Sequence, residues 1–236
     1  MRIAALSDIH GNLPALEAVL ADVEAEGVDA IVVPGDTVSG PWPAEVFELV
    51  TGVGAQLVRG NADRLVLERD EEHLGAWSAD RLGEERLAVV GAWPLTLELE
   101  LDGLGRVLVC HSTPSSDDPI YTRITPDAEL VTTLGTVEAD VLLCGHTHMQ
   151  YDRRLSSGLR VVNPGSVGLP YEGRRGAFWA LLGPDVEFRE TDYDVAATVD
   201  AIHALGAPVN EELLELMSSP PDSETATAEF ETLRGA

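Results

Sequence analysis

The first two-thirds of the chain repeats one pattern of hydrophobic and polar positions. A short apolar run rich in β-type residues is followed by a polar or glycine-containing break and then by an amphipathic segment. The segment 13–26 is a clear example, because its apolar side chains recur at helical spacing and Pro14 falls in the first turn, where proline is tolerated. The pattern therefore predicts strands that alternate with helices.

The early apolar runs are continuous rather than alternating, as expected of strands that are covered on both faces. After residue 92 the sequence becomes rich in short strands, beginning with an alternating segment around Pro94. We predict helices at 13–26, 44–50, 127–134 and 195–205, with further helical segments from 62 to about 90. The predicted strands are 3–6, 31–33, 57–58, 93–101, 107–110, 141–144, 150–155, 159–162, 177–182 and 186–190. Strand–helix alternation followed by strand-rich sequence predicts an α/β sandwich with sheets inside and helices outside.

The chain length of 236 residues suits one sizeable domain, which we place at residues 1–206. The remaining residues, 207–236, are acidic and contain a Ser-Ser-Pro-Pro-Asp stretch at 218–222. We expect this tail to form a short helix and then a loose end.

The composition and the N-terminal residues indicate where in the cell the protein is expected. The apolar fraction of 44% supplies an ordinary core, and no uninterrupted apolar run approaches the ~20 residues that cross a bilayer. The first six residues are too short for a secretory signal, and only two cysteines occur, Cys110 and Cys144. We therefore expect a cytoplasmic protein with reduced, buried thiols and no membrane partner.

The formal net charge of −26 is the most extreme feature of the composition. Such a surface repels phosphate backbones and argues against binding of long nucleic acids. A small anionic substrate remains compatible, because bound metal ions invert the local field in a cleft. Solubility is the simplest explanation of the acidity.

Candidate metal ligands follow five of the predicted strands. In open α/β sheets the carboxyl ends of strands meet at one crevice, so these side chains are expected to lie together. Seven ligands are too many for one tetrahedral zinc ion, but they suit two metals that share a bridging ligand. The seven residues are Asp8, His10, Asp36, Asn61, His111, His146 and His148.

The spacing of the ligands supports this hypothesis. The pairs Asp8/His10 and His146/His148 are each two residues apart, which in extended chain places both side chains on the same side. Glycines at 35, 60 and 145 allow the backbone to approach the site closely. Each motif alone is weak evidence, since an Asp-x-His pair is common by chance. Cys144 stays open as an alternative thiolate ligand beside His146.

The five motifs in this order resemble the calcineurin-like metallophosphoesterases, and most of all their small bacterial and archaeal phosphodiesterase branch. The stretch Asn163-Pro164-Gly165-Ser166-Val167-Gly168 is also similar to that branch. The resemblance covers roughly residues 1–190. It implies a four-layer α/β/β/α sandwich in which two mixed sheets are flanked by helices.

The resemblance also implies roles for the seven residues. Asp8, His10 and His148 would hold one metal, while Asn61, His111 and His146 would hold the other and Asp36 would bridge them. A hydroxide shared by the metals would attack the phosphorus of a small phosphorylated substrate, which makes Asp36, Asn61 and His111 the expected catalytic residues. Carboxylate and imidazole ligands without thiolate fit Mn, Fe or Zn, and fit Mg or Ca poorly.

One position departs from the family pattern. Many members carry a histidine after the Gly-Asn pair, where this chain has Ala62 followed by Asp63. General acid catalysis contributes ~10²–10⁴-fold, so we expect a preference for esters with acidic leaving groups, such as aryl phosphodiesters. Candidates for substrate contacts or for replacing the missing group are Arg64, Tyr121, His73 and Arg174.

Some alternatives remain open at this point. Trp42 and Trp77 would suit a nucleobase pocket, although packing is the simpler explanation. A phosphoprotein phosphatase is a second possible enzyme. A binding scaffold that kept the fold and lost catalysis, as the retromer subunit of this fold has done, is the non-enzymatic alternative, and Ala62 favours it.

Overall fold

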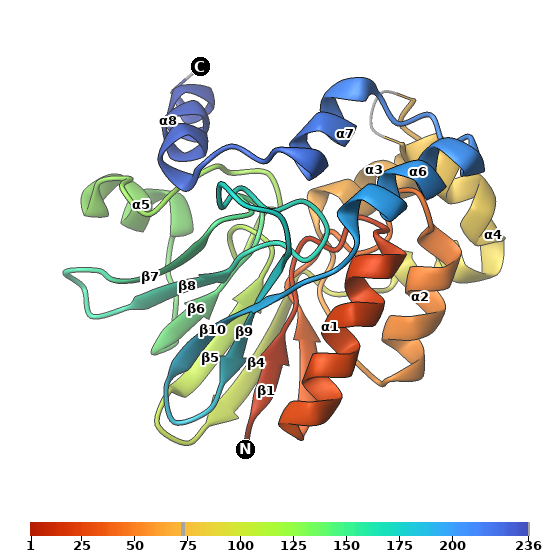
Figure 1. Ribbon diagram of the computed structural model, residues 1–236. Coiled ribbons are helices and arrows are strands. Elements are labelled where there is room, and N and C mark those ends of the chain that lie inside the picture. Colours follow the sequence, from red (N-terminus) through yellow and green to blue (C-terminus); the bar gives the residue numbers. More distant parts are fainter. Residues whose placement is uncertain (72–73, 236) are drawn as a thin grey trace.

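The computed structural model describes residues 1–71 and 74–235, which form two five-stranded mixed sheets packed face to face (Figure 1). The first sheet has the order β10-β9-β1-β2-β3, in which β1, β2 and β3 are parallel and β9 pairs antiparallel with both β1 and β10. Its strands are β1 (Ile3–Ala5), β2 (Ala30–Val33), β3 (Gln56–Leu57), β9 (Ala177–Leu182) and β10 (Val186–Thr191).

The second sheet has the order β4-β5-β6-β8-β7. Strands β5, β6 and β8 are parallel, while β4 and β7 pair antiparallel at the two edges. Its strands are β4 (Thr96–Leu101), β5 (Gly105–Cys110), β6 (Val141–Leu143), β7 (Gln150–Arg154) and β8 (Arg160–Pro164).

Helices cover the outer faces of both sheets. Side chains of α1 (Leu13–Glu26), α2 (Pro43–Gly52), α3 (Asn61–Glu68) and α4 (Gly75–Gly91) pack with the first sheet in one hydrophobic cluster. On the second sheet, α5 (Asp127–Leu134) supplies Leu130 and Leu134 to a separate cluster. The fold is therefore the four-layer α/β/β/α sandwich that the sequence predicts.

Alternation along β1 shows how the strands separate the layers. Ile3 and Ala5 face the second sheet and join the cluster between the sheets. Ala4 and Leu6 point the other way and pack beneath the helices. Both sides are buried, which explains why this strand is a continuous apolar run.

The predicted elements agree closely with the structure. The helices predicted at 13–26, 127–134 and 195–205 have those bounds in the structure. The first begins at the N-cap Asn12, whose side chain accepts a hydrogen bond from Ala15 N, and ends at Gly27 in the left-handed conformation. Local capping thus sets both ends of the helix.

The C-terminal tail differs from the expectation. Three helices, α6 (Val195–Leu205), α7 (Glu211–Ser218) and α8 (Ser223–Arg234), cross the top of the molecule in Figure 1. Residues 223–234, for which we expected a loose end, form a helix, because Asp222 caps its first turn and accepts from Glu224 N and Thr225 N. The division of the chain at residue 206 stays a prediction.

Side-chain hydrogen bonds hold α8 against the domain. Glu231 accepts from the hydroxyls of Thr122 and Thr125, and Arg234 donates to Glu129 of α5. These contacts are made by residues more than 100 positions apart in the chain, so local sequence patterns do not reveal them.

No helix in the described parts of the chain is long and apolar enough to span a lipid bilayer.

Asp222→Ala should loosen α8. The substitution removes the acceptor for two backbone N–H groups, which typically costs about 1 kcal/mol. We expect faster amide hydrogen exchange across 223–234, with little change in the exchange of α1. Asp222→Asn keeps a capping oxygen and should restore the protection. Equal exchange in wild type and Asp222→Ala would contradict the capping role.

Candidate metal centre

The predicted ligands converge at one end of both sheets, just beyond the strands that carry them. Asp8 and His10 follow β1, Asp36 follows β2, and Asn61 begins α3 after β3. From the second sheet, His111 follows β5, and His146 and His148 follow β6. The sandwich therefore brings together residues that span 140 positions of sequence, as the crevice at the carboxyl ends of strands predicts.

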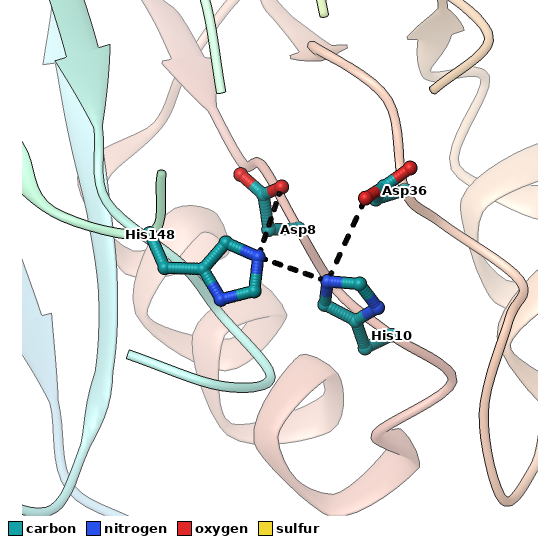
Figure 2. Close-up of side chains that lie close together, drawn as sticks. All are labelled: Asp8, His10, Asp36 and His148. Atoms are coloured by element: carbon teal, nitrogen blue, oxygen red, sulfur yellow. Dashed lines mark hydrogen bonds and ion pairs between the residues drawn. The ribbon is translucent and has the colours of Figure 1, made fainter. Parts of the chain in front are cut away.

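Four of these side chains form a first group (Figure 2). One ligand atom each from Asp8, His10, Asp36 and His148 lie within 4.8 Å of one another. His148 Nε2 lies 3.4 Å from Asp8 Oδ1 and 3.1 Å from His10 Nε2, and His10 Nε2 lies 3.7 Å from Asp36 Oδ2. These are the residues expected at the first metal, together with the expected bridge.

A second group adjoins the first through Asp36. His111 Nε2 lies 3.3 Å from Asp36 Oδ2, 2.8 Å from Asn61 Oδ1 and 3.2 Å from His146 Nδ1. The oxygen Oδ2 of Asp36 therefore neighbours both groups, while Oδ1 accepts a hydrogen bond from Ala62 N at 2.8 Å. This arrangement fits a carboxylate that bridges two cations.

The donor chemistry of the two groups fits metal ions. His148 Nδ1 lies 2.7 Å from Leu169 O, and His111 Nδ1 lies 2.8 Å from Pro34 O. A carbonyl oxygen only accepts, so each Nδ1 carries hydrogen and each Nε2 is the atom that faces the centre and can bind a cation, as in ligating histidines. Electron-rich nitrogens and carboxylate oxygens at these distances require a proton or a cation between them.

The pKa values of the histidines follow from this crowding. Burial and the neighbouring His148 lower the pKa of His10 to about 4, and burial and His111 lower that of His146 to about 4. Burial also acts to lower the pKa of His111, but the adjacent Asp36 carboxylate outweighs it and raises the value to about 10. Asp36 itself is buried, yet His111 holds its pKa well below the usual range. His10 and His146 are thus neutral at pH 7, while His111 keeps a proton until a cation replaces it.

A family model for the calcineurin-like phosphoesterase superfamily domain matches residues 1–182. The chain belongs to this superfamily. The motifs that carry the resemblance therefore identify a hydrolase family of metal-dependent phosphoesterases, and the cluster around Asp36 is the place where this member can bind metal.

Relatives of the chain include archaeal and bacterial proteins. An uncharacterised protein of Methanocaldococcus jannaschii is 29% identical over 227 residues, covering 85% of this chain and 91% of that protein. The phosphodiesterase YfcE of Escherichia coli is 27% identical over 202 residues, covering 79% and 89%. A metallophosphoesterase structure from Sphaerobacter thermophilus matches with a TM-score of 0.75 at 29% identity, covering 93% of this chain and 99% of that one. A Pyrococcus horikoshii structure shares the fold, with a TM-score of 0.79 at 24% identity.

The backbone of the phosphoesterase site is strained in a way that sequence spacing did not predict. Seven non-glycine residues of the described chain have positive φ, and five of them are candidate ligands: Asp8, His10, Asp36, His146 and His148. The expectation that each pair two residues apart lies in extended chain was therefore wrong. Left-handed turns make the side chains converge, each at an unfavourable free energy of order 1–3 kcal/mol, and such strain is typical of functional sites.

The glycines next to the ligands are required by close approach, as predicted. A Cβ atom on Gly60 would lie 2.1 Å from Asp36 Oδ1, and one on Gly145 would lie 2.1 Å from Ser7 Oγ. Any side chain at these positions would displace the backbone that carries a ligand.

The segment 163–168 holds the two strained ligand loops together, a role that composition alone did not reveal. Ser166 donates its hydroxyl to Asp8 O, and Gly168 N donates to the same carbonyl. Asn163 Nδ2 donates to Gly145 O at 2.6 Å, in the loop that carries His146. This turn is thus the link between the loops after β1 and β6.

Asp63 also has a structural role in place of its missing imidazole partner. Its carboxylate accepts from the backbone N–H groups of Thr37, Val38 and Gly60, and so joins the loop after Asp36 to the start of α3. Ala62 lies between Asn61 and Asp63 and lines the cavity beside the metal centre. The space that the family histidine would occupy is therefore part of the cavity in this chain.

Three of the residues suggested as substrate contacts are described, and their side chains are engaged in other interactions. Arg64 is paired with Asp117 and Asp118, and Arg174 with Glu190. Tyr121 is 3% exposed, and its hydroxyl donates to Ser112 O in the core. Arg64, Tyr121 and Arg174 do not line the cavity, so their assignment to substrate binding is not supported. His73 lies outside the described residues.

The packing of the tryptophans and cysteines accounts for them without a role at the site. Trp77 donates its indole N–H to Pro41 O and lies beneath Arg81, while Trp42 packs with α6 and α7. Cys144 is buried in the cluster under α5, where burial raises its pKa to about 11. Cys144 therefore faces away from the metal ligands, and both cysteines are free and buried, as expected.

Metal binding should release a proton from His111. Because its pKa is raised to about 10, the metal-free side chain is protonated at pH 7 and must lose the proton to become a ligand. The apparent affinity for the metal in this group should rise up to about tenfold per pH unit between pH 6 and 9. Calorimetric titration with Mn²⁺ or Zn²⁺ in two buffers of different ionisation enthalpy measures the release, expected near one proton per chain. Release of no proton at pH 7 would contradict this.

Proposed function

We propose that this protein is a di-metal phosphodiesterase that hydrolyses a small phosphorylated substrate. The observation that carries the proposal is the position of Asp36 Oδ2 between two groups of ligands, 3.7 Å from His10 Nε2 and 3.3 Å from His111 Nε2. Two ligand groups that share one carboxylate are the arrangement a two-metal phosphoesterase requires.

Each metal would have its own ligands. Asp8, His10 and His148 would hold one ion, with Asn61, His111 and His146 holding the other. Two bound ions would lower the pKa of bound water and would stabilise negative charge on the oxygens of the reacting phosphate. The oxygen and nitrogen ligands fit Mn, Fe or Zn.

The protein side chains orient this chemistry. Ala62 N fixes Asp36 through Oδ1, which leaves Oδ2 for the bridge. Leu169 O and Pro34 O fix the rings of His148 and His111, so that Nε2 points inward in both. Such prior orientation lowers the cost of assembling the site when substrate arrives.

Charge favours a diester over a monoester. A phosphodiester carries one negative charge at pH 7, whereas a monoester carries nearly two. No arginine is among the described residues that line the cavity, and the sequence contains no lysine. The metals must therefore balance the phosphate charge almost alone, in a protein of net charge −26. The Escherichia coli relative is also named a phosphodiesterase.

A binding scaffold is the second candidate, and Ala62 is the observation that favours it. Loss of the usual histidine removes a group that assists the leaving oxygen. The metal content of the purified protein discriminates between an enzyme and a scaffold, since a scaffold has no need to bind two ions tightly. We also propose a cytoplasmic location, supported by the two free, buried cysteines.

Asp36→Asn and His111→Ala should abolish diester cleavage. Wild type is expected to bind about two metal ions per chain and to cleave bis(p-nitrophenyl) phosphate faster than p-nitrophenyl phosphate when Mn²⁺ is added. Both variants should lose at least about 10²-fold in kcat/KM, since the bridge or a ligand is removed. Metal analysis of each purified variant runs beside the assay.

Asp185→Asn is a matched control for these variants, because Asp185 is an exposed acid in the turn between β9 and β10 whose side chain pairs with Arg160. Wild type without metal or activity after repletion would favour the scaffold. Metal binding without cleavage of either ester would contradict the proposed activity while leaving the metal site intact.

Ala62→His should extend the range of leaving groups. Wild type is expected to prefer acidic leaving groups, so that alkyl phosphomonoesters are turned over far more slowly than aryl phosphodiesters. A histidine at 62 would face the cavity and should raise kcat/KM for an alkyl leaving group by about tenfold, below the ~10²–10⁴-fold of an optimised general acid. Rates with p-nitrophenolate as leaving group should change little.

Ala62→Asn fills the same space without supplying an acid and should not reproduce the gain. Equal turnover of alkyl monoesters and aryl diesters by wild type would contradict the expected leaving-group preference.

A further inference from the structure

A cavity of about 640 Å³ begins at the metal centre and extends beneath the C-terminal helices. At one end it is lined by ligands of both groups, including His10, Asn61 and His146, which are the partly exposed members of the set. The volume lies in the range that holds a small organic ligand. A ligand that fills this cavity would therefore contact the metal centre at one end only.

The far end of the cavity is apolar, and the C-terminal helices supply much of its wall. Leu213, Leu216 and Met217 of α7 and Phe230 and Leu233 of α8 line it. Leu233 is 60% exposed, so the described residues leave much of this apolar side chain uncovered. We call this part of the cavity the apolar chamber, defined by these five residues.

Charge and hydrogen bonding are nearly absent from the chamber. No arginine is among the described residues that line the cavity, and Glu212 is the acidic side chain that lines it outside the metal ligands. Asn210 Oδ1 accepts from Leu213 N as the cap of α7, and Asn12 Nδ2 donates to Gly168 O and Tyr193 Oη. The chamber thus offers no cation to a second phosphate, and Glu212 would repel one.

The chamber wall is held in place by several hydrogen bonds. Gly173 N donates to Pro221 O, and Arg175 Nε donates to Ser218 O at 2.6 Å, both at the connection between α7 and α8. Phe230 lies near Tyr171, with ring centroids 6.1 Å apart, and Tyr171 stacks on the ligand His148 at 5.0 Å. An aromatic path therefore connects α8 directly to the metal centre.

We propose that the apolar chamber binds a hydrophobic group of the substrate, so that the protein acts on phosphodiesters in which one ester group is an apolar alkyl or aryl group. This inference rests on the proposed phosphodiesterase function, because it assigns the substrate class of the same site. The phosphate would lie at the metals and the apolar group beneath α7 and α8.

Binding of phosphonates to the metal-loaded protein tests the proposal without turnover, because their P–C bond is not hydrolysed. The series is methyl-, hexyl-, phenyl- and 2-(2-hydroxyethoxy)ethylphosphonate, measured by titration calorimetry. A buried methylene contributes roughly fourfold in affinity, so hexylphosphonate should bind at least about tenfold more tightly than methylphosphonate. The hydroxyethoxyethyl compound has similar length and should bind like the methyl compound.

The phenyl and hexyl arms distinguish an aryl from an alkyl substrate. Equal affinity for all four phosphonates, or no binding of hexylphosphonate at millimolar concentration, would overturn the proposal that the chamber binds an apolar group. If diesters are cleaved but all phosphonates bind with equal affinity, the proposed phosphodiesterase activity is supported and only the proposed substrate class is contradicted. Tight binding of hexylphosphonate without cleavage of any ester would support the apolar chamber and contradict the proposed phosphodiesterase activity.

A matched pair of variants locates the binding. Leu233→Asp places a charge at the chamber, whereas Val131→Asp makes the same kind of change on α5, at a residue that is 42% exposed and outside the cavity lining. Leu233→Asp should reduce the hexyl-to-methyl affinity ratio at least about threefold, with unchanged methylphosphonate affinity. Val131→Asp should change neither. An unchanged ratio in Leu233→Asp, or an equal loss in both variants, would overturn the assignment.

Discussion

The carboxylate of Asp36 is the point through which the two halves of the metal centre interact. Oδ2 faces histidines from both sheets, and Oδ1 is tied to Ala62 N at the start of α3. The carboxylate and His111 shift one another's pKa in opposite directions, so the pair is an internal ion pair until a cation enters. Without this carboxylate the group of Asn61, His111 and His146 would contain no negatively charged side chain to compensate a bound cation.

Bringing so many electron-pair donors together requires the loops to be held against strain. Five candidate ligands have positive φ, and none of them is glycine, the residue that adopts this region most readily. Hydrogen bonds from Ser166, Gly168 and Asn163 fasten the loops after β1 and β6 to each other. The free energy of packing in the sandwich thus maintains a geometry that the loops alone would not adopt.

The C-terminal helices add a second constraint to the site. The family model ends at residue 182, whereas α6, α7 and α8 lie beyond that residue and form one wall of the cavity. The match to the Sphaerobacter thermophilus structure covers 93% of this chain, so it reaches well beyond the family model. The metal ligands belong to the shared domain, and the shape of the cavity depends on the C-terminal helices.

The sequence by itself predicted the candidate ligand set and determined most elements of the fold. Apolar runs followed by Asp, His or Asn mark strand ends, and helix 13–26 is delimited by its own caps, because such signals are local. Tertiary structure alone decided three things. The ligands converge through left-handed turns rather than extended chain, residues 163–168 act as the link between loops, and 223–234 is a helix that walls the cavity. Each depends on contacts between residues far apart in the chain, such as Glu231 with Thr122, and no local period records them.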